Sequence, residues 1–260
     1  MSALSSLPGP CHAVVIGHAG AIGGAMFDAL LADDNVAQIS AGSRQGGEAR
    51  GNDAWEDGAA VLAGKQAGQM AVDIGDEASI AAFAAHVGAG PPPRLILVTT
   101  GLLHGEGQQP EKRWQSLNAE ALQRSFLINS IGPALVAKHL LPLMPRSGKA
   151  VFAVLSARVS SISDNRLGGW YGYRASKAAL NMLIKTLSIE LAHNRPDALC
   201  VALHPGTVDS VLSRPFQANV PPERLFTPAH SAQHLLQVID SLSADRSGEL
   251  IGWDGETIAF

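Results

Sequence analysis

A chain of 260 residues is long enough for one large α/β domain, and 46% hydrophobic residues are enough to bury a sizeable core. Charged residues make up only 16% of the sequence, which argues against a disordered chain. The formal net charge of -4 gives no electrostatic reason to expect nucleic acid or an anionic membrane as a partner.

Short apolar runs alternate with helical stretches along the whole chain. We predict strands at residues 13–16, 36–41, 70–74, 95–99, 150–155, 199–203 and 249–253. We predict helices at residues 22–31, 77–87, 173–193 and 231–242, and mostly helix over 117–144, where Pro133 and Pro142 kink or end segments. Residues 45–68, rich in Gly and Gln, are expected to form a loop with a poorly defined helix.

Continuous apolar strands that alternate with helices predict a parallel sheet covered on both faces. We therefore expect an α/β fold, a doubly wound and mainly parallel sheet of about seven strands, with a cofactor at the carboxyl ends of the strands. No stretch is long enough to serve as a linker, so residues 1–260 are expected to form a single dinucleotide-binding domain.

The two cysteines, Cys11 and Cys200, lie far apart, and the sequence has no Cys-x-x-Cys motif and no His/Cys cluster. This pattern favours two buried thiols over a disulfide or a metal site. The first ten residues lack the basic segment and apolar region of a signal peptide. No apolar run approaches the roughly 20 residues that span a bilayer. We expect a soluble, cytoplasmic protein without a metal or a membrane partner.

A glycine-rich turn joins the first predicted strand to the first predicted helix. Glycines let backbone amides approach a pyrophosphate, and the helix N-terminus adds its dipole and free N–H donors. Many strand–helix turns carry glycine for steric reasons alone, but this one follows the first strand of an α/β chain. The predicted phosphate-binding residues are Gly17, Ala19, Gly20, Ala21, Ile22 and Gly23.

The second predicted strand ends in Ala41-Gly42-Ser43-Arg44, which contains no carboxylate. NAD-binding sites place an acidic residue at this point to bond the ribose hydroxyls. A guanidinium suits a 2′-phosphate through its charge and fork geometry, so Ser43 and Arg44 favour NADP(H) over NAD(H). The alternative is that Arg44 is a solvated surface arginine.

Asp73 and Ile74 lie at the end of the third predicted strand and are further candidates for the cofactor site. The Asp73 carboxylate suits a hydrogen bond from the adenine amino group. It suits equally well a cap on the helix that begins near Asp76.

Tyr173 and Lys177 are four residues apart at the start of the predicted helix 173–193. Residues at this spacing share a helix face, so Lys177 is expected beside Tyr173. A cation close to a phenol lowers the phenol pKa, and a tyrosine tuned in this way exchanges a proton with a carbonyl or alcohol oxygen. Taken alone, the spacing is common on helix surfaces.

Together these motifs resemble the short-chain dehydrogenase/reductase family over nearly the whole chain. The resemblance is carried, in the family's order, by residues 16–23, Asp73, Asn129, the Tyr173/Lys177 pair, and Pro205-Gly206-Thr207-Val208. Within the family, residues 168–177, 204–209 and 252–255 are most similar to the C-factor and sniffer-type carbonyl reductases.

The resemblance implies a Rossmann-type fold and an NADP(H)-dependent oxidoreductase that interconverts a small-molecule carbonyl and an alcohol by hydride transfer. It implies that Tyr173 is the general acid/base, that Lys177 lowers its pKa and holds the nicotinamide ribose, and that Asn129 holds a water linking Lys177 to solvent. Without the resemblance, Asn129 reads as a helix amide bonded to backbone. Further cofactor contacts are implied for Thr99, Thr100, Gly101, Pro205, Gly206, Thr207 and Val208. Family members usually pair through the helices that match residues 117–144 and 173–193, which implies a homodimer or homotetramer.

Three departures from the family pattern bear on activity. The glycine loop has Ala21 and Ile16 at positions where the family has glycine and threonine, and the segment Thr99-Thr100-Gly101 is altered. The third departure concerns the active serine, whose position is Ala157. Ser156 takes that role after a one-residue shift, or Ser160 or Ser161 reaches the pocket from the next loop. The alternative function is a cofactor-binding sensor or signalling protein with little or no catalysis.

The substrate side is expected between residues 208 and 227. Its apolar residues line a pocket or pack on the core: Val211, Leu212, Phe216, Val220 and Phe226. His104 faces the site or is structural.

Overall fold

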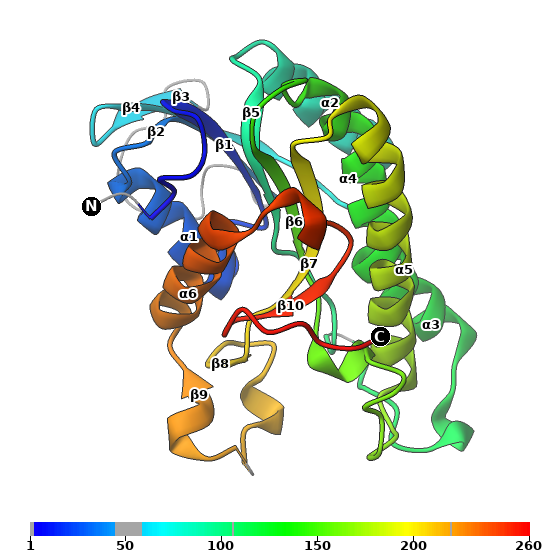
Figure 1. Ribbon diagram of the computed structural model, residues 1–260. Helices are drawn as coiled ribbons and strands as arrows, with labels where there is room; N and C mark the ends of the chain where they lie inside the picture. The colour runs from blue at the N-terminus through cyan, green and yellow to red at the C-terminus, as the bar shows by residue number, and fades with distance from the viewer. Residues whose placement is uncertain (1–2, 45–58, 106, 219) are drawn as a thin grey trace.

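The computed structural model describes residues 3–44, 59–105, 107–218 and 220–260 (Figure 1). One eight-stranded sheet forms its centre, in the order β10-β7-β6-β5-β1-β2-β4-β3. The strands are β1 (Cys11–Ile16), β2 (Val36–Ser43), β3 (Ala59–Leu62), β4 (Lys65–Ala71), β5 (Pro93–Val98), β6 (Ala150–Leu155), β7 (Ala198–His204) and β10 (Leu250–Gly252). A separate pair joins β8 (Thr207–Val208) to β9 (Leu225–Phe226) in parallel.

All neighbouring strands of the large sheet run parallel except β3, which pairs antiparallel with β4 at one edge. The chain winds outward from β1 through β2 to one edge and from β5 through β6 to the other. The strand order therefore reverses between β1 and β5, which is where open α/β sheets bind ligands at the carboxyl ends of their strands. The predicted doubly wound, mainly parallel sheet is confirmed.

The prediction of a loop over residues 45–68 is wrong for its described part, and residues 45–58 lie outside the described chain. β3 and β4 form a hairpin whose two turn residues, Ala63 and Gly64, have φ angles of 50° and 78°. Two consecutive positive φ angles are typical of the tight turns that match the twist of paired strands. The third parallel strand consequently covers Lys65–Ala71 instead of residues 70–74.

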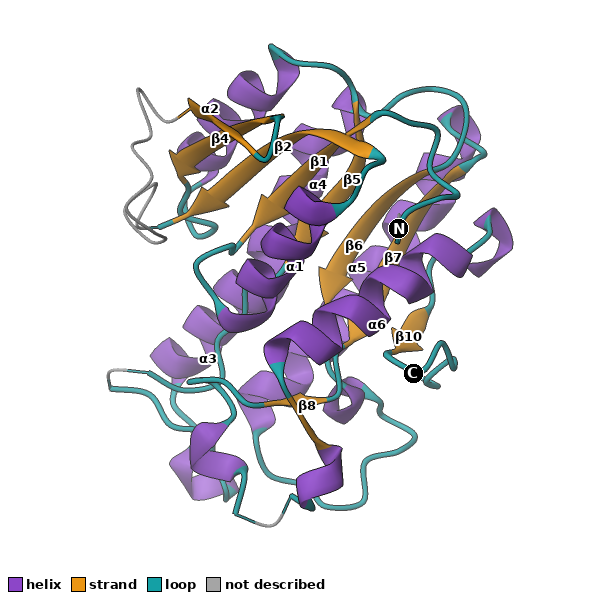
Figure 2. Cartoon of the chain, turned by 90° about the vertical axis from the view of Figure 1, so that its left-hand side faces the viewer, coloured by secondary structure: helices purple, strands orange, loops and turns teal. Residues whose placement is uncertain are grey.

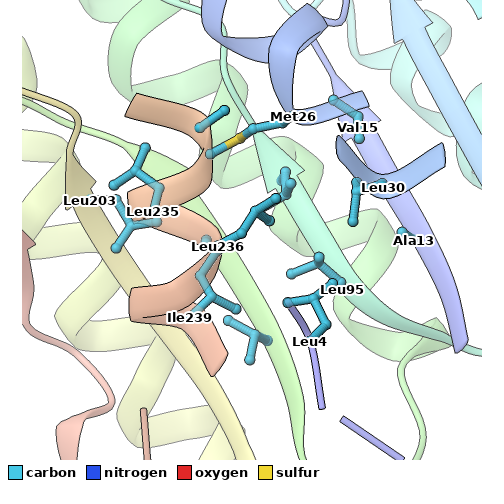
Figure 3. Close-up of a cluster of buried hydrophobic side chains, with 14 of the residues drawn as sticks. Leu4, Ala13, Val15, Met26, Leu30, Leu95, Leu203, Leu235, Leu236 and Ile239 are labelled. Atoms are coloured by element: carbon cyan, nitrogen blue, oxygen red, sulfur yellow. The ribbon is translucent and has the colours of Figure 1, made fainter. Parts of the chain in front are cut away.

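Helices cover both faces of the sheet (Figures 1 and 2). α1 (Ala21–Ala32) and α6 (Pro228–Ser241) pack together on one face. α2 (Glu77–Gly88), α4 (Gly132–Leu140) and α5 (Tyr171–Asn194) cover the other. Figure 3 shows how Met26 and Leu30 of α1 meet Leu235 and Leu236 of α6 over the strands. This buried cluster fixes α1 and α6 against the sheet.

The predicted helical region 117–144 is divided into four segments. They are α3 (Ala119–Phe126), a π-helical segment (Leu127–Ile131), α4, and a 3₁₀ turn (Leu141–Leu143). Pro133 lies in the first turn of α4 and Pro142 lies in the 3₁₀ turn, so both prolines mark segment ends as predicted. By length and composition alone, Ala119–Leu143 would suffice to cross a membrane, but core helices pass the same test. The absence of a membrane partner therefore stays a prediction.

Both cysteines are free thiols buried in the sheet, as the sequence predicts. Burial raises the pKa of the Cys11 thiol to about 11, and it raises the pKa of Cys200 further. Neither thiol is set up to react at neutral pH.

Candidate active site

The glycine loop packs closely against the end of β5. Gly17 has a φ of 95°, and its N–H donates to the Gly42 carbonyl over 2.7 Å. A Cβ on Gly23 would lie 2.3 Å from both the Gly17 carbonyl oxygen and Thr99 Oγ1. The Thr99 hydroxyl in turn donates to the Ile16 carbonyl over 2.9 Å. Only glycine therefore fits at residue 23.

The N-terminus of α1 is open to an anion. Its N-cap is Gly20, so no side chain accepts the first N–H groups, and its first turn has no acidic residue. Ala19 and Gly20 are exposed, and Ala21 and Ile22 are half-buried. The residues therefore fit a dinucleotide pyrophosphate, despite Ala21 at a family glycine position.

Ser43 ends β2 as a buried residue and is followed by Arg44, which is exposed. The carboxyl ends of β2 and β4 are adjacent, because the N–H of Val72, the residue after β4, donates to the Ser43 carbonyl over 2.8 Å. Asp76, not Asp73, caps α2 by accepting the Ala78 N–H at 3.0 Å. Exposed Asp73 accepts the N–H of Gly75 at 2.8 Å, and Ile74 is buried. The capping alternative is thus excluded for Asp73.

The segment 99–101 contacts the glycine loop at one end and lies close to Lys177 at the other. Thr100 Oγ1 is buried and has no hydrogen-bond partner among the residues that the structure describes. A Cβ on Gly101 would lie 3.8 Å from both Asn129 Oδ1 and Lys177 Nζ. The altered segment Thr99-Thr100-Gly101 therefore lies between the predicted phosphate site and the predicted catalytic side chains.

Asn129 is fully buried in the π-helical segment and joins three parts of the site. Its Oδ1 accepts the Leu102 N–H at 2.7 Å, and its Nδ2 donates to the Leu102 carbonyl at 2.8 Å and to Ser176 Oγ at 3.0 Å. The amide does bond to backbone, but to a strand-end loop and not to its own helix. Single π-turns are frequent at functional sites because they free backbone groups from the helical ladder.

Tyr173 and Lys177 lie in the first two turns of α5, which begins at Tyr171. Lys177 is 2% exposed, and its Nζ donates to the Leu155 carbonyl at the end of β6 over 2.7 Å. Burial raises the pKa of Tyr173 to about 12, because the phenolate loses its hydration. Burial also lowers the pKa of Lys177 to about 7. The phenol pKa is thus shifted in the direction opposite to the expected one.

The serines after β6 form a network with Asn181 of α5. The Ser156 hydroxyl donates to Asn181 Oδ1 over 2.8 Å, and Asn181 Nδ2 donates to Ser160 Oγ over 2.8 Å. Ser160 in turn donates to the carbonyl of Ala157 over 2.5 Å. Ser161 interacts instead with Ser163 and the Asp164 backbone. In the described part of the chain, none of these hydroxyls bonds to Tyr173.

The segment Pro205-Gly206-Thr207-Val208 follows β7 at the same edge of the sheet. Gly206 has a φ of 76°, and a Cβ there would lie 2.7 Å from the Phe226 ring. Ser231 of α6 donates to the Pro205 carbonyl over 2.8 Å. This turn is therefore held rigidly beside the crevice, where the resemblance implies cofactor contacts.

The rings of Trp170 and Phe216 form an aromatic wall beside Tyr173. The Trp170 ring lies 6.3 Å from the Tyr173 ring and 4.9 Å from the Phe216 ring, and Phe216 lies 5.7 Å from the His104 ring. His104 Nε2 lies 3.1 Å from each of the carbonyl oxygens of Val211 and Leu212. His104 thus ties the loop after β5 to the 208–227 segment, and Phe216 faces the site and not the core.

The sequence model of the short chain dehydrogenase family matches residues 11–221 of this chain. The chain belongs to the short-chain dehydrogenase family. It is therefore an oxidoreductase, and the resemblance inferred from its motifs is confirmed.

Two members of known name are similar to this chain in sequence. The C-signal protein of Myxococcus xanthus is 33% identical over 140 residues, which are 54% of this chain and 78% of that protein. The 1-hydroxy-2-glutathionyl-2-methyl-3-butene dehydrogenase of Rhodococcus sp. (strain AD45) is 30% identical over 199 residues, which are 76% of this chain and 83% of that protein.

Solved structures agree with this fold. NADPH-bound carbonyl reductase from chicken fatty liver superposes with a TM-score of 0.81 and 27% identity, covering 98% of this chain and 100% of that one. Carbonyl reductase Sniffer of D. melanogaster superposes with a TM-score of 0.80 and 21% identity, covering 97% of this chain and 100% of that one, which shows a shared fold.

Two site residues of this short-chain dehydrogenase have no signal in the sequence alone. Asn181 is one of several polar residues on a long helix. Glu111 lies in a charged loop, yet its side chain is buried against α5. Only the folded chain brings these two residues to the site.

Proposed function

We propose that this short-chain dehydrogenase is an NADP(H)-dependent enzyme that interconverts a carbonyl and an alcohol, with Tyr173 as the general acid/base. The observation that carries the proposal is the convergence of Tyr173, Lys177 and Asn129 next to the glycine loop at the point where the strand order reverses. A perturbed tyrosine and lysine in one crevice mark a catalytic site.

Support for the cofactor comes from two features of the chain and from one relative of the same fold. The uncapped N-terminus of α1 and the close packing of Gly17 and Gly23 fit a pyrophosphate. Exposed Arg44, in place of an acidic residue, fits a 2′-phosphate next to Ser43. The chicken carbonyl reductase that shares this fold is NADPH-bound. The remaining cofactor contacts fall to residues 73–74, 99–101 and 205–208.

NADPH supplies a hydride to the carbonyl carbon when it is bound. Tyr173, with a pKa near 12, keeps its proton at neutral pH and donates it to the carbonyl oxygen during reduction. The Lys177 ammonium, one turn along the same helix face, stabilises the phenolate that this transfer leaves. Asn129 fixes the Leu102 backbone and Ser176, and so keeps the lysine environment in place.

Ser156 is the proposed donor to the substrate oxygen. Its single O–H points to Asn181 Oδ1, so it serves the substrate only when the Asn181 amide is turned with its nitrogen toward Ser156. The two ends of an amide side chain are nearly equivalent in shape, and the turned amide would donate to Ser156 and free its proton. Ser160 or Ser161 is the alternative donor.

The remaining features of the proposed enzyme concern its setting. We place the activity in the cytoplasm, on residues 1–260 as a single domain, with no nucleic acid or membrane partner. The substrate is a small carbonyl or alcohol compound that contacts the aromatic wall of Trp170 and Phe216. Assembly into a homodimer or homotetramer through the α3–α4 and α5 region completes the proposal.

The test is an NADPH-oxidation screen over aldehydes, ketones and quinones, with product analysis by mass spectrometry. We expect at least one carbonyl compound to be reduced to its alcohol, with one NADPH consumed per alcohol formed. NADPH binding without turnover on any of these compounds would contradict the proposal, and it would favour a cofactor-binding protein with little catalysis.

A further inference from the structure

The start of α5 has an unusual backbone. Gly168, Gly169 and Trp170 have consecutive φ angles of 63°, 65° and 52°, all in the left-handed region. Trp170 is the N-cap residue, and its side chain accepts no hydrogen bond from the helix. A left-handed bulky residue costs about 1 kcal/mol or more, so other contacts must hold this turn three residues before Tyr173.

Glu111 provides two of these contacts from a loop about sixty residues earlier in the chain. Its carboxylate Oε2 accepts the Gly172 N–H at 3.0 Å, in the first turn of α5. Its backbone carbonyl accepts the Trp170 N–H at 2.5 Å. Arg174 closes the turn from the other side, by donating to the carbonyls of Gly169 at 3.0 Å and Val159 at 2.9 Å.

Glu111 is 7% exposed as a residue, which is a costly place for an acid without partners. Its second oxygen faces Gly172, where an added Cβ would lie 3.0 Å from Oε1 and 3.2 Å from Ser125 Oγ. A helix N-terminus favours a negative charge, and a side-chain acceptor at this point replaces the cap that Trp170 does not supply. Gly172 lets the carboxylate come this close.

We propose that Glu111 is a positioning residue that caps α5 and thereby sets the place of Tyr173 at the crevice. Glu111 contacts Gly172, the residue immediately before Tyr173, and it also holds Trp170 in the aromatic wall. The inference rests on the proposed function, because it assigns Glu111 a task in placing the proton donor. Displacement of a catalytic group by about 1 Å is enough to slow a reaction strongly.

Three variants test this role: Glu111→Ala, Glu111→Gln, and, as a control, Glu190→Ala at an exposed glutamate near the other end of α5. Glu111→Ala should lower kcat by about tenfold or more and leave the Kd for NADPH within about threefold, because the cap is remote from the phosphate loop. Glu111→Gln keeps an acceptor oxygen and should recover kcat to within about threefold of the parent, and Glu190→Ala should match the parent. Parent-like kcat in Glu111→Ala would overturn the role, as would a folded Glu111→Gln below about one tenth of the parent kcat.

Hydrogen exchange separates this inference from the proposed function. In Glu111→Ala, amides of residues 168–176 should exchange faster than in the parent, whereas amides of residues 180–194 should not change. Hydrogen exchange can be measured without a substrate. If no carbonyl substrate is found, the proposed function fails, but the capping role of Glu111 is still tested. Unchanged exchange at residues 168–176 would overturn the positioning role. If Glu111→Ala does not fold, the kcat and the hydrogen exchange of Glu111→Gln are used to test the positioning role.

Discussion

Burial sets the protonation of the two central side chains, Tyr173 and Lys177. With a pKa near 12, the phenol is a proton donor and not a resting phenolate. With a pKa near 7, the amine carries its charge only in part of the molecules at neutral pH. This state suits the reduction of a carbonyl, in which the tyrosine first gives up a proton.

Lys177 should also make stability depend on pH. The pKa falls from 10.5 to about 7 on folding, so between these values the unfolded chain binds a proton that the folded chain does not. The free energy of unfolding therefore decreases as pH falls from about 10 to about 7, and Lys177→Met removes this loss. In urea titrations, we expect the free energy of unfolding of Lys177→Met to rise relative to that of the parent as the pH is lowered over this range. The difference should grow by on the order of 1 kcal/mol for each pH unit.

The matched control is Lys185→Met, a lysine exposed on the same helix. Its stability relative to the parent should be constant over this pH range. A constant difference for Lys177→Met as well would show that the buried amine is not proton-linked to folding.

Arg44 sets the choice of cofactor at the end of β2. We expect NADPH to bind at least about tenfold tighter than NADH, which is about 1.4 kcal/mol, because the guanidinium pairs with the 2′-phosphate. Arg44→Ala should remove most of that difference in titrations of NAD(P)H fluorescence. Arg146→Ala, at an exposed site outside the crevice, should keep it. Equal affinities of the parent protein for the two cofactors would reject the assignment.

At the scale of elements, the Ser156–Asn181 bond joins the end of β6 to α5. If Ser156 serves the substrate oxygen, Ser156→Ala should lower kcat by about 100-fold or more, in addition to the loss of thermal stability that follows from the lost Asn181 partner. Steady-state kinetics and a thermal melt decide this, with Ser163→Ala as the control on the exposed loop. A lower melting temperature with parent-like kcat would make Ser156 structural and pass the role to Ser160 or Ser161.

The sequence predicts the elements whose signal is local. Apolar runs place the parallel strands other than β4 within a few residues, and β6 matches over Ala150–Leu155. The hairpin of β3 and β4 is missed because β3 is an apolar run of only four residues and β4 is rich in Ala, Gly and Gln, so neither shows a clear strand pattern. Only the positive φ angles of Ala63 and Gly64 reveal the turn between them.

The same division holds for the candidate site. Tyr173, Lys177 and the glycine loop are predictable, because short spacings along the chain place these residues on one helix face or in one turn. Glu111 and Asn181 act through contacts between distant segments, which no local pattern encodes. The phenol pKa is missed for a related reason, since burial outweighs the neighbouring amine and burial depends on the whole fold.

For the whole molecule, exposed apolar side chains lie on the segments of the proposed interface. Ile131, Met182 and Ile189 are 46%, 68% and 56% exposed. Exposed apolar side chains on these segments fit burial against a second copy of the chain. Light scattering at micromolar concentration should give a dimer or tetramer of the 27.1 kDa chain. Met182→Glu should shift the mass toward the monomer, and a monomeric parent protein would refute the assembly.

In the proposed reaction, Tyr173 supplies the proton while a hydride reaches the carbonyl carbon. The most direct test compares the parent with Tyr173→Phe, which keeps the ring and deletes only the hydroxyl. Turnover with the best carbonyl substrate of the parent and the Kd for NADPH are measured on both proteins. Tyr173→Phe should lose turnover, because its only change is the missing proton donor, while NADPH binds within a few-fold of the parent. A Tyr173→Phe variant as active as the parent on every accepted substrate would contradict this role of Tyr173.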